Sequence, residues 1–249
     1  MEIAQLVGTE EAMVAWRDDL LSLAHSEGSE AEVFAGVENL ARGLGFDYCA
    51  YGLQMPVPVS APRVFMVNNY PDPWRERYVS SGYLSVDPTV RHGHSSLQPL
   101  TWNAQSGGEH SEFWEDAKAH NIAYGWCQSS FTRTGIGGLL TLSRSHEAIS
   151  TSEIIQKGIQ FHWLVHITHE AMAHRQVKRM NASYPLKLSD RETEVLRWTA
   201  DGKSAQEIAD ILNVTKHTVE FHIKNAVNKL QAVNKTSAVV KALVLGLLW

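Results

Sequence analysis

The stretch that decides the fold of the C-terminal quarter is Leu188–Leu230, which reads LSDRETEVLRWTADGKSAQEIADILNVTKHTVEFHIKNAVNKL. It contains two S-x-x-E pairs, Ser189 with Glu192 and Ser204 with Glu207. In such a capping box the hydroxyl and the carboxylate each accept a hydrogen bond from a backbone amide at the start of a helix, where no helical carbonyl is available. Each pair therefore predicts the beginning of a helix.

A third helix is predicted directly after a turn of three residues, 213–215, with Thr215 as its N-cap. The second and third helices each carry apolar residues at the spacing of one buried helical face. These residues are Ala205, Ile208, Ala209 and Leu212, followed by Val219, Ile223, Ala226, Val227 and Leu230. Two helices joined by so short a turn are typical of a helix-turn-helix, although a plain three-helix bundle would show the same capping and spacing.

The third helix carries polar residues outside its apolar stripe. They are Lys216, His217, Glu220, Lys224, Asn225 and Lys229. Such side chains contact phosphates and base edges from the major groove, but the solvent-exposed face of an ordinary helical domain has a similar composition. The polar face by itself leaves both interpretations open.

The run SDRETEVLRWTADGKSAQEIA, followed by TVEFHIKNAVNKL, resembles the LuxR-type (GerE-like) DNA-binding domain over about 60 residues. The family pattern is matched at Glu192, Leu196, Gly202, Lys203, Ile208, Ala209, Thr218, Val219, His222, Asn225, Lys229 and Leu230. Ala226 departs from it, because the family usually has a larger aliphatic residue there, and this suggests looser packing of the helix. The resemblance implies that Lys203, Thr215, Lys216, His217, Thr218, Glu220, His222, Lys224, Asn225 and Lys229 form the DNA-binding surface.

Composition limits the class of protein. The 249 residues are 44% hydrophobic and 20% charged, which is typical of a globular chain with one large or two modest domains. No apolar run approaches the length of about 18 residues that a membrane span needs. The N-terminal segment lacks the basic start of a secretory signal. Cys49 and Cys127 lie far apart without metal-ligand spacing, so we expect reduced thiols in a cytoplasmic protein.

The net charge of −5 is unevenly distributed. From Pro185 onward nine Lys and Arg residues oppose seven Asp and Glu residues, so this part carries +2 and the rest of the chain −7. DNA would repel the acidic part and weakly attract the C-terminal part. We therefore expect any DNA contact at one end of the chain.

The N-terminal part alternates between the two kinds of element. Helices are predicted at 9–24, 29–43, 74–81, 111–121 and 150–180, the second and fifth opened by capping boxes at Ser29/Glu32 and Ser150/Glu153. Strands are predicted at 46–55, 64–68, 100–102, 125–131 and 138–143, with 86–89 irregular and 92–94 in a loop. This order predicts an α+β domain, an α/β/α sandwich with an antiparallel sheet, ahead of an all-α four-helix domain. The expected domains are 1–180 and 186–249, joined by a linker at 181–185.

The densest cluster of aromatic and polar residues is Asn68–Val90. Four aromatic residues there, Tyr70, Trp74, Tyr78 and Tyr83, would supply flat walls with polar tips, and Asp87 and Thr89 would supply hydrogen-bonding groups. A pocket with that mixture suits a mostly apolar small molecule with one polar head. Aromatic residues packed into an ordinary core would give the same composition.

The segment Tyr70-Pro-x-x-Trp74 and the later Gly-Tyr-x-x-Val-Asp87-Pro-Thr89 resemble the acyl-homoserine lactone binding domain of quorum-sensing LuxR-type regulators, as do Trp102 and the strand at 138–142. The resemblance implies that Trp74 donates to the lactone carbonyl, Tyr70 donates to the amide carbonyl, and Asp87 accepts from the amide N–H. Thr141 would reach the same amide region. The remaining expected ligand contacts are Tyr78, Thr89, Val90 and Trp102.

The resemblance thus predicts a quorum-sensing regulator that binds an N-acyl-homoserine lactone and, as a homodimer, an inverted repeat in promoter DNA. RNA polymerase is a further partner on this view, and no cofactor and no membrane contact are expected. The alternative is a LuxR-type DNA-binding domain joined to a sensor of a different small molecule. Candidate dimer-surface residues are Ile154, Gly158, Phe161, Val165 and Met172, and, near the C-terminus, Val239, Val240, Leu243 and Val244.

Catalysis and metal binding are not expected. His162, His166 and His169 share one helical face, but no nearby Cys or Asp completes a metal site, so solvated or dimer-facing imidazoles are predicted. The histidines of HEAMAH at 169–174 are five residues apart and therefore do not fit the zinc-binding H-E-x-x-H pattern. The glycine run at 135–138 lacks the lysine of a phosphate loop, and no nucleophile motif is visible, so no catalytic residue is assigned.

Overall fold

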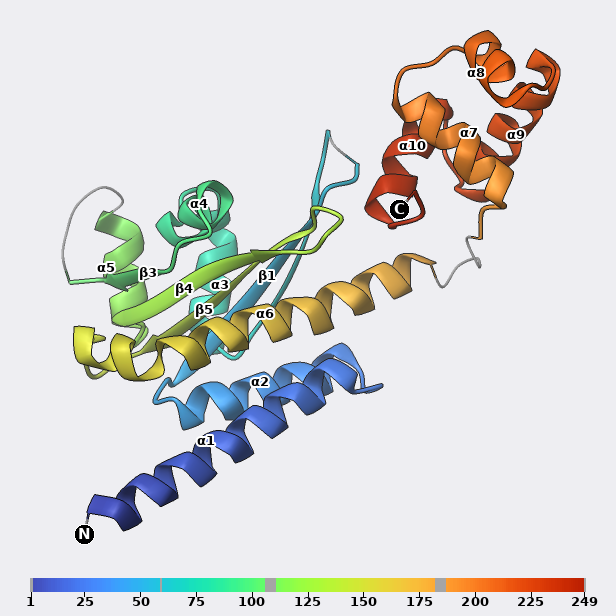
Figure 1. The fold of residues 1–249 in the computed structure, drawn as a ribbon. Coiled ribbons are helices and arrows are strands. Elements are labelled where there is room, and N and C mark those ends of the chain that lie inside the picture. The colour runs from blue at the N-terminus through green and yellow to red at the C-terminus, as the bar shows by residue number, and fades with distance from the viewer. Residues whose placement is uncertain (1, 59, 106–110, 182–186, 249) are drawn as a thin grey trace. The chain divides into compact units, whose positions relative to one another are not determined.

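The computed structural model describes residues 2–58, 60–105, 111–181 and 187–248. The chain divides into two compact units, and each is considered by itself. The first contains most of the sheet and its helices, up to Arg175 in the long helix α6 (Figure 1). The second contains helices α7–α10, together with the end of α6 from Gln176 and the segments that begin at Met55 and at Arg133. None of the described helices is long and apolar enough to cross a membrane.

The first unit is built on a five-stranded sheet with the strand order β2-β1-β5-β4-β3. The strands are β1 (Tyr48–Met55), β2 (Arg63–Asn68), β3 (Leu100–Asn103), β4 (Tyr124–Phe131) and β5 (Gly137–Arg144). The pairs β1/β5, β5/β4 and β4/β3 are antiparallel. The predicted antiparallel sheet is therefore confirmed, each strand agreeing with its predicted range to within two residues.

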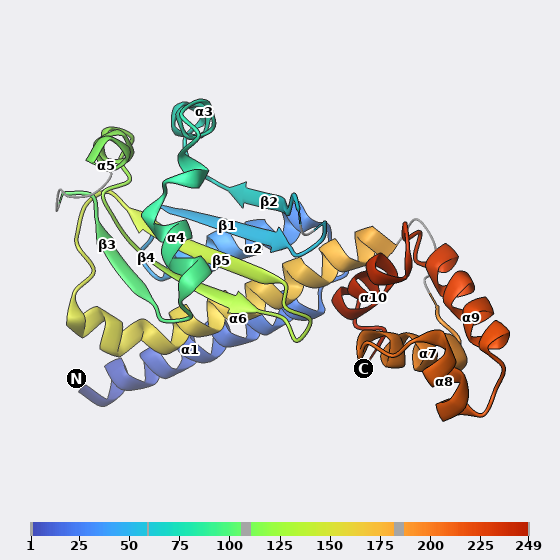
Figure 2. The same cartoon turned by 90° about the horizontal axis from the view of Figure 1, so that it is seen from above.

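Helices cover both faces of this sheet. The first unit contains α1 (Glu2–His25), α2 (Glu30–Gly43), α3 (Asp72–Ser80), the short 3-10 helix η1 (Tyr83–Ser85), α4 (Pro88–Ser95), α5 (Ser111–Ala119) and α6 (Thr151–Asn181). Both views show α6 along one face and α3, α4 and α5 on the other (Figures 1 and 2). The predicted layers of helix, sheet and helix are thus present.

Side chains alternate between the two faces of the sheet, so that one face is apolar and the other carries both polar and apolar residues. Leu140 and Leu142 of β5 are fully buried and belong to the face covered by α6, where Phe161 packs against Trp126 of β4 with ring centroids 5.3 Å apart. Thr141 and Ser143 alternate with these leucines and therefore point to the opposite face. Polar groups are thus presented toward α3, α4 and α5.

The start of α6 is fixed by a buried ion pair. Arg144 at the end of β5 bonds the carboxylate of Glu153 at 2.7 Å, and both side chains are largely buried. The hydroxyl of Ser150 accepts from the Glu153 amide, as predicted. The predicted capping box is nevertheless incomplete, because the Glu153 carboxylate is bonded to Arg144 and Lys157.

Two local predictions in this unit are wrong. Residues 88–95 form α4, whereas the sequence suggested an irregular segment at 86–89 and a loop at 92–94. Pro88 is accommodated because it stands in the first turn, where its missing N–H is not required. Asp87 remains outside the helix as its N-cap. The end of α6 differs as well, since Asn181 is helical and not part of the linker, whose other residues, 182–185, lie outside the described ranges.

The second unit contains α7 (Asp190–Ala200), α8 (Ala205–Leu212), α9 (Lys216–Lys229) and α10 (Lys235–Val244). Both predicted capping boxes are formed, at Ser189 and at Ser204. Asn213 ends α8 in the left-handed conformation, with a φ of 53°, and Thr215 caps α9. The predicted four-helix domain with its short turn between α8 and α9 is confirmed.

Two apolar clusters hold the second unit together. One joins the residues Val195, Ile208, Ala209 and Val219, so that α7 and α8 pack against α9. The other contains Leu188, Leu196, Ala226, Leu230, Ala238, Val239, Ala242 and Leu248. Val239 is thus part of this domain's core, while Leu243 is partly buried against it. The predicted apolar stripes of α8 and α9 therefore face the interior.

Candidate effector and DNA-binding sites

An aromatic cluster lies between the mixed face of the sheet and helices α3 and α5. Its buried members are Trp74, Tyr83, Phe113, Ala117 and Ile122, with Tyr48, Tyr70, Tyr78, Val86, Trp102 and Trp114 partly buried against them. The rings meet edge to face or tilted, as between Trp74 and Phe113 with centroids 5.8 Å apart. The cluster unites four of the predicted ligand contacts: Tyr70, Trp74, Tyr78 and Trp102.

Asp87 is the charged group of this region and is only 7% exposed. Its Oδ1 accepts from the amide and the hydroxyl of Thr89, at 2.8 and 2.7 Å, which is the capping interaction of α4. Its Oδ2 accepts from the Tyr78 hydroxyl at 2.9 Å. Burial raises the pKa of the Asp87 carboxyl, and the hydrogen bonds from Thr89 and Tyr78 offset part of that rise. The predicted Asp87, Thr89 and Tyr78 therefore form one connected group.

Several polar groups beside Asp87 lack partners within the described protein. The Trp102 indole N–H and the Ser143 hydroxyl are buried without a hydrogen-bond partner among the described residues. Ser143 lies near the Tyr70 hydroxyl, whose pKa is raised by burial. The Trp74 side chain, 3% exposed, belongs to the same aromatic cluster. Buried donors are costly when unpaired, so these groups point to a bound molecule that supplies acceptors.

The sheet is adapted to this site at Gly125. Trp102 pairs with Gly125 across β3 and β4, and a Cβ built on this glycine would lie 2.1 Å from the indole ring. Only glycine therefore allows the Trp102 ring to lie across the neighbouring strand. On β5, Thr141 is buried on the same face, opposite Cys127 of β4. Val90 is partly buried in the first turn of α4.

A polar network that no sequence pattern predicts supports the cluster. Asp116 of α5 accepts from the Tyr83 hydroxyl and from Arg77 of α3, which ties η1, α3 and α5 together. Bonds to Tyr83 and Arg77 hold the pKa of the Asp116 carboxyl below its usual range. Phe113 and Trp114 of α5 belong to the same cluster as Trp74 of α3. No local spacing relates α5 to α3, so only the fold brings them together.

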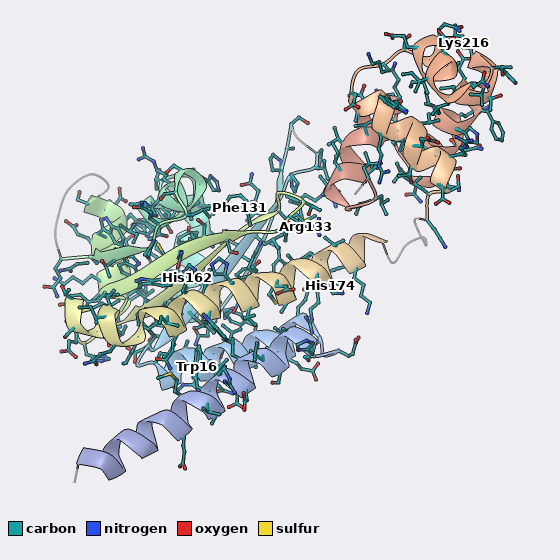
Figure 3. All side chains as sticks on the ribbon, viewed as in Figure 1. Trp16, Phe131, Arg133, His162, His174 and Lys216 are labelled. Atoms are coloured by element: carbon teal, nitrogen blue, oxygen red, sulfur yellow. The ribbon has the colours of Figure 1, made fainter. Side chains whose placement is uncertain are left out.

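The predicted DNA-contacting residues lie on α9 and next to α8. Lys216, His217, Glu220 and Lys224 are exposed, as is Thr215, while Lys203, Thr218, His222 and Asn225 are partly buried. Thr215 also has a structural part, since its hydroxyl accepts from the Thr218 amide at 3.1 Å. Lys216 stands at the start of α9 (Figure 3). Phe221, 56% exposed, is a large apolar residue on this helix that the sequence reasoning omitted.

Lys229 has a partner within the domain. Its Nζ donates to the carboxylate of Glu192 at 2.7 Å, and the Glu192 side chain is 5% exposed. Burial disfavours the charged carboxylate, but bonds from Lys229 and from the Ser189 amide outweigh it and hold the pKa of Glu192 below its ordinary value. The ion pair fixes the end of α9 against the start of α7.

We expect Lys229→Met to lower the free energy of unfolding of the second unit by about 1–3 kcal/mol, because it leaves a buried carboxylate without its cation. Lys224→Met, on the same helix but at a lysine without a carboxylate partner among the described residues, is the matched control and should unfold at nearly the wild-type denaturant concentration. The depressed pKa of Glu192 gives stability that is present above the pKa of the unfolded chain and lost as pH falls through the folded value. Equal urea midpoints for both variants would exclude this role.

The prediction for the α6 histidines is wrong for one of them. His169 is 2% exposed and its Nδ1 lies 2.8 Å from the Tyr51 hydroxyl of β1. His169 is thus neither exposed to solvent nor accessible to a second copy of the chain. Gly138 of β5 makes room for this contact, since a Cβ there would lie 2.3 Å from the imidazole. Tyr51 lies more than one hundred residues before His169 in the chain, so no local sequence pattern predicts this contact.

The predicted dimer surface on α6 also needs correction. Phe161, Val165 and Met172 are at most 1% exposed because they pack onto the sheet. The exposed apolar residues of this helix are Ile155, Ile159 and Trp163, at 78%, 76% and 42%. Phe161, Val165 and Met172 therefore lie on the face of α6 that the sheet covers.

Two families match this chain in consecutive parts. Residues 29–172 match the family described as "Autoinducer binding domain", and residues 186–242 match "Bacterial regulatory proteins, luxR family". The aromatic cluster with Asp87 belongs to the first part, and α7–α9 belong to the second. The fold and the site thus define a two-domain regulator of transcription with an effector-binding domain and a DNA-binding domain.

The chain belongs to the LuxR family of quorum-sensing transcriptional regulators, which are not enzymes. It is 43% identical to the transcriptional activator protein AnoR of Acinetobacter nosocomialis over 95% of this chain and all of AnoR. It is 33% identical to the quorum-sensing regulator RhlR of Pseudomonas aeruginosa, over 94% of this chain and 96% of RhlR.

Solved structures agree with this assignment. The regulatory protein SdiA of Escherichia coli is 32% identical and matches with a TM-score of 0.77 over 95% of this chain and 99% of SdiA. Another SdiA structure, in complex with octanoyl-rac-glycerol, matches equally well. CepR2 of Burkholderia cenocepacia, described as an N-acylhomoserine lactone dependent transcription factor, is 30% identical with a TM-score of 0.61 over 66% of this chain and 96% of the CepR2 chain.

Proposed function

We propose that the autoinducer bound by this chain is an N-acyl-homoserine lactone and that it occupies the aromatic cluster beside Asp87. The observation that carries the proposal is a buried carboxylate next to unpaired buried donors. A lactone with an amide-linked acyl chain supplies one N–H for the carboxylate and two carbonyls for the donors. The apolar rings of the cluster match its hydrocarbon chain.

Each predicted contact residue then has a role in binding the lactone. The Trp74 indole donates to the lactone carbonyl, the Tyr70 hydroxyl donates to the amide carbonyl, and Asp87 accepts from the amide N–H. Tyr78 and Thr89 hold the Asp87 carboxylate in place, as their hydrogen bonds to it suggest. Thr141 lies on the mixed face of the sheet within reach of the same region. Val90 and Trp102 complete the apolar walls, and the unpaired Trp102 indole offers a further donor.

The experiment that tests this assignment is expression with and without acyl-homoserine lactones of several chain lengths. Because the ligand would satisfy buried donors and fill an apolar core, we expect soluble yield and thermal stability to rise only with lactones that fit. A yield and melting temperature that no lactone changes would count against the proposal.

A second candidate effector is an acylglycerol. SdiA, 32% identical to this chain, has been solved in complex with octanoyl-rac-glycerol. Such a molecule also combines an acyl chain with a small polar head, but it has no amide N–H for Asp87. The same stability experiment with octanoyl glycerol in place of the lactones distinguishes the two, and we expect the lactone to stabilise more.

We further propose that α9 enters the major groove of an inverted repeat in promoter DNA, with one helix for each half-site. The tight turn between α8 and α9 and the exposed residues Lys216, His217 and Lys224 support this placement. Lys229 then acts mainly through Glu192 and contributes to DNA binding as a support for the helix. RNA polymerase is the expected partner if the bound protein activates transcription, and the cytoplasm is the expected location.

Lys224→Ala should weaken operator binding and lower the slope of log Kobs against log[salt] by about one per chain if the lysine contacts a phosphate. Binding should be measured at several salt concentrations on the operator and on a scrambled duplex. Lys235→Ala, at the start of α10, is the control and should leave the slope unchanged. A loss confined to the operator at unchanged slope would assign Lys224 to base reading instead.

The boundaries 1–180 and 186–249 remain our proposal for the two functional parts, with dimerisation assigned to the first. The exposed stripe of Ile155, Ile159 and Trp163 on α6 is the surface we propose for a second copy. Three large apolar residues exposed on one helix in this way are typical of a protein interface.

Ile159→Asp should raise the dissociation constant of the dimer by at least about tenfold, since it places a charge where each chain would bury an apolar side chain. Sedimentation across a concentration series in the presence of lactone measures this change. Val79→Asp, at an equally exposed apolar residue on α3, should leave association unaltered. Equal dissociation constants for the wild type and Ile159→Asp would place the interface elsewhere.

A further inference from the structure

Two histidines of α6 form a pair whose geometry the proposed function does not use. His162 and His166 are exposed one turn apart, and their Nε2 atoms lie 3.0 Å from each other. The ring centroids are 4.3 Å apart with the planes inclined by 73°. The edge of one ring thus faces the other ring, with the two Nε2 atoms within hydrogen-bonding distance of each other.

The other nitrogen of each ring is held by strand β4. His162 Nδ1 lies 3.0 Å from Oε1 of Gln128, and His166 Nδ1 lies 2.8 Å from the hydroxyl of Ser130. Gln128 and Ser130 are 4% and 3% exposed, so the supports themselves are packed. Both imidazoles are thus oriented from the sheet beneath them.

The protonation pattern of His162 follows from the glutamine. Gln128 Nε2 donates to the carbonyl of Leu97 at 2.9 Å, which leaves Oε1 as the atom facing His162. An oxygen there requires a proton on His162 Nδ1, so the lone pair of neutral His162 is on Nε2 and points at His166. In the free protein His166 donates from Nε2 to this lone pair and accepts from Ser130.

We propose that His162 and His166 form a two-imidazole binding site for a borderline divalent cation such as Zn²⁺ or Cu²⁺. A metal ion about 2.0–2.1 Å from both Nε2 atoms would subtend an N–metal–N angle of about 95°, between the ideal octahedral and tetrahedral values. Imidazole nitrogens favour this class of metal. No third His, Cys, Asp or Glu joins the pair among the described residues, so the remaining coordination positions are not filled by them.

The partners on β4 are those that such a site needs. A histidine that binds metal through Nε2 usually donates its Nδ1–H to an oxygen, which fixes the ring and increases its basicity. Gln128 already accepts from His162. The Ser130 hydroxyl can accept from His166 once the His166 proton moves from Nε2 to Nδ1. An imidazole in its neutral form keeps one proton throughout, so this change of tautomer releases no proton.

Electrostatics agrees with the geometry. Burial and the neighbouring His162 lower the pKa of His166, so its imidazole is neutral near pH 7 and free to coordinate. The sequence predicted no metal site, because His162, His166 and His169 share one helical face without a nearby Cys or Asp. The structure separates them, with His169 bonded to Tyr51 and the other two facing each other.

The test is Zn²⁺ titration by calorimetry of untagged, EDTA-treated full-length protein, with Cu²⁺ electron paramagnetic resonance as the structural readout. We expect one site per chain and hyperfine coupling to two nitrogens. His162→Gln and His166→Gln should each weaken Zn²⁺ binding at least about tenfold, as should Ser130→Ala, which keeps both imidazoles but removes a support. His174→Gln, on a later turn of the same helix (Figure 3), is the control and should bind as the wild type does.

The metal-free histidine variants should melt close to the wild type, because both imidazoles are exposed. If a histidine variant melts at a lower temperature than the wild type, the Zn²⁺ affinity of Ser130→Ala and the copper spectrum of the wild type still test the site. Zn²⁺ affinity that survives His162→Gln, or that falls equally in His174→Gln, would show adventitious binding and overturn the site. A copper spectrum with coupling to a single nitrogen would do the same.

Discussion

Asp87→Asn is expected to reduce the response to the acyl-homoserine lactone about 10- to 150-fold, which corresponds to the loss of a hydrogen bond to a charged group. The substitution is conservative for the fold, because asparagine caps a helix as well as aspartate does and its oxygen can still accept from Thr89. The other carboxylate oxygen, Oδ2, which accepts hydrogen bonds, is replaced by an NH₂ group, which donates them. The ligand amide N–H then faces a donor.

The pH dependence of binding tests the same contact. Burial raises the pKa of Asp87 in the free protein, so the folded chain holds this proton more tightly than the unfolded chain does. A ligand N–H favours the carboxylate and lowers that pKa again, so binding releases a proton. Affinity should therefore fall as pH is lowered through the raised pKa, and Asp87→Asn should lose this component.

Titration of ligand-dependent thermal stability at several pH values measures both effects. Val79→Ala, at an exposed position of α3, serves as the control for substitution near the site. If Asp87→Asn kept both the wild-type affinity and the wild-type pH profile, Asp87 would be a helix cap and no more.

Trp74→Phe is the second large effect, with an expected loss of about 1–3 kcal/mol in ligand binding. Phenylalanine keeps a ring among Tyr78, Tyr83 and Phe113, so most of the packing remains. What disappears is the indole N–H, the proposed donor to the lactone carbonyl. A dose-response curve in a reporter assay, together with ligand-dependent melting of the purified protein, measures the loss.

Tyr83→Phe is the matched control for this prediction. It removes a polar group from the same aromatic cluster, but the Tyr83 hydroxyl is bonded to Asp116. We therefore expect it to alter stability more than ligand response. Equal shifts in the dose-response of both variants would mean that the cluster tolerates no change, and the proposed donor role of Trp74 would lose its support.

The C-terminal fold could be predicted from sequence because its signals are local. A serine and a glutamate three residues apart define each capping box, and Asn213 and Thr215 bracket the turn within one short segment.

The strands of the N-terminal part were likewise visible as short runs between turn residues. At α4 the prediction was misled by Pro88, since proline disfavours the helical region for the residue before it and yet favours a helix that starts at its own position.

The site was less accessible to the same reasoning. Tyr70, Trp74 and Asp87 were found because they lie in one segment and match a family pattern. Ser143 was not predicted, because it lies on β5 and its exposure to the same face as Trp102 depends on sheet register. The burial of His169 depends on Tyr51, more than one hundred residues away. Helical periodicity showed that α6 has an apolar face but did not show that a second, exposed stripe exists.

The central claim, that an acyl-homoserine lactone occupies the site at Asp87, is tested most directly by identifying the bound molecule. The full-length protein should be purified from cells supplied with a mixture of lactones, denatured, extracted and examined by mass spectrometry. We predict recovery of one lactone molecule per chain, strongly reduced for Asp87→Asn and Trp74→Phe. Recovery of no lactone, or of a different acyl compound in its place, would contradict the account.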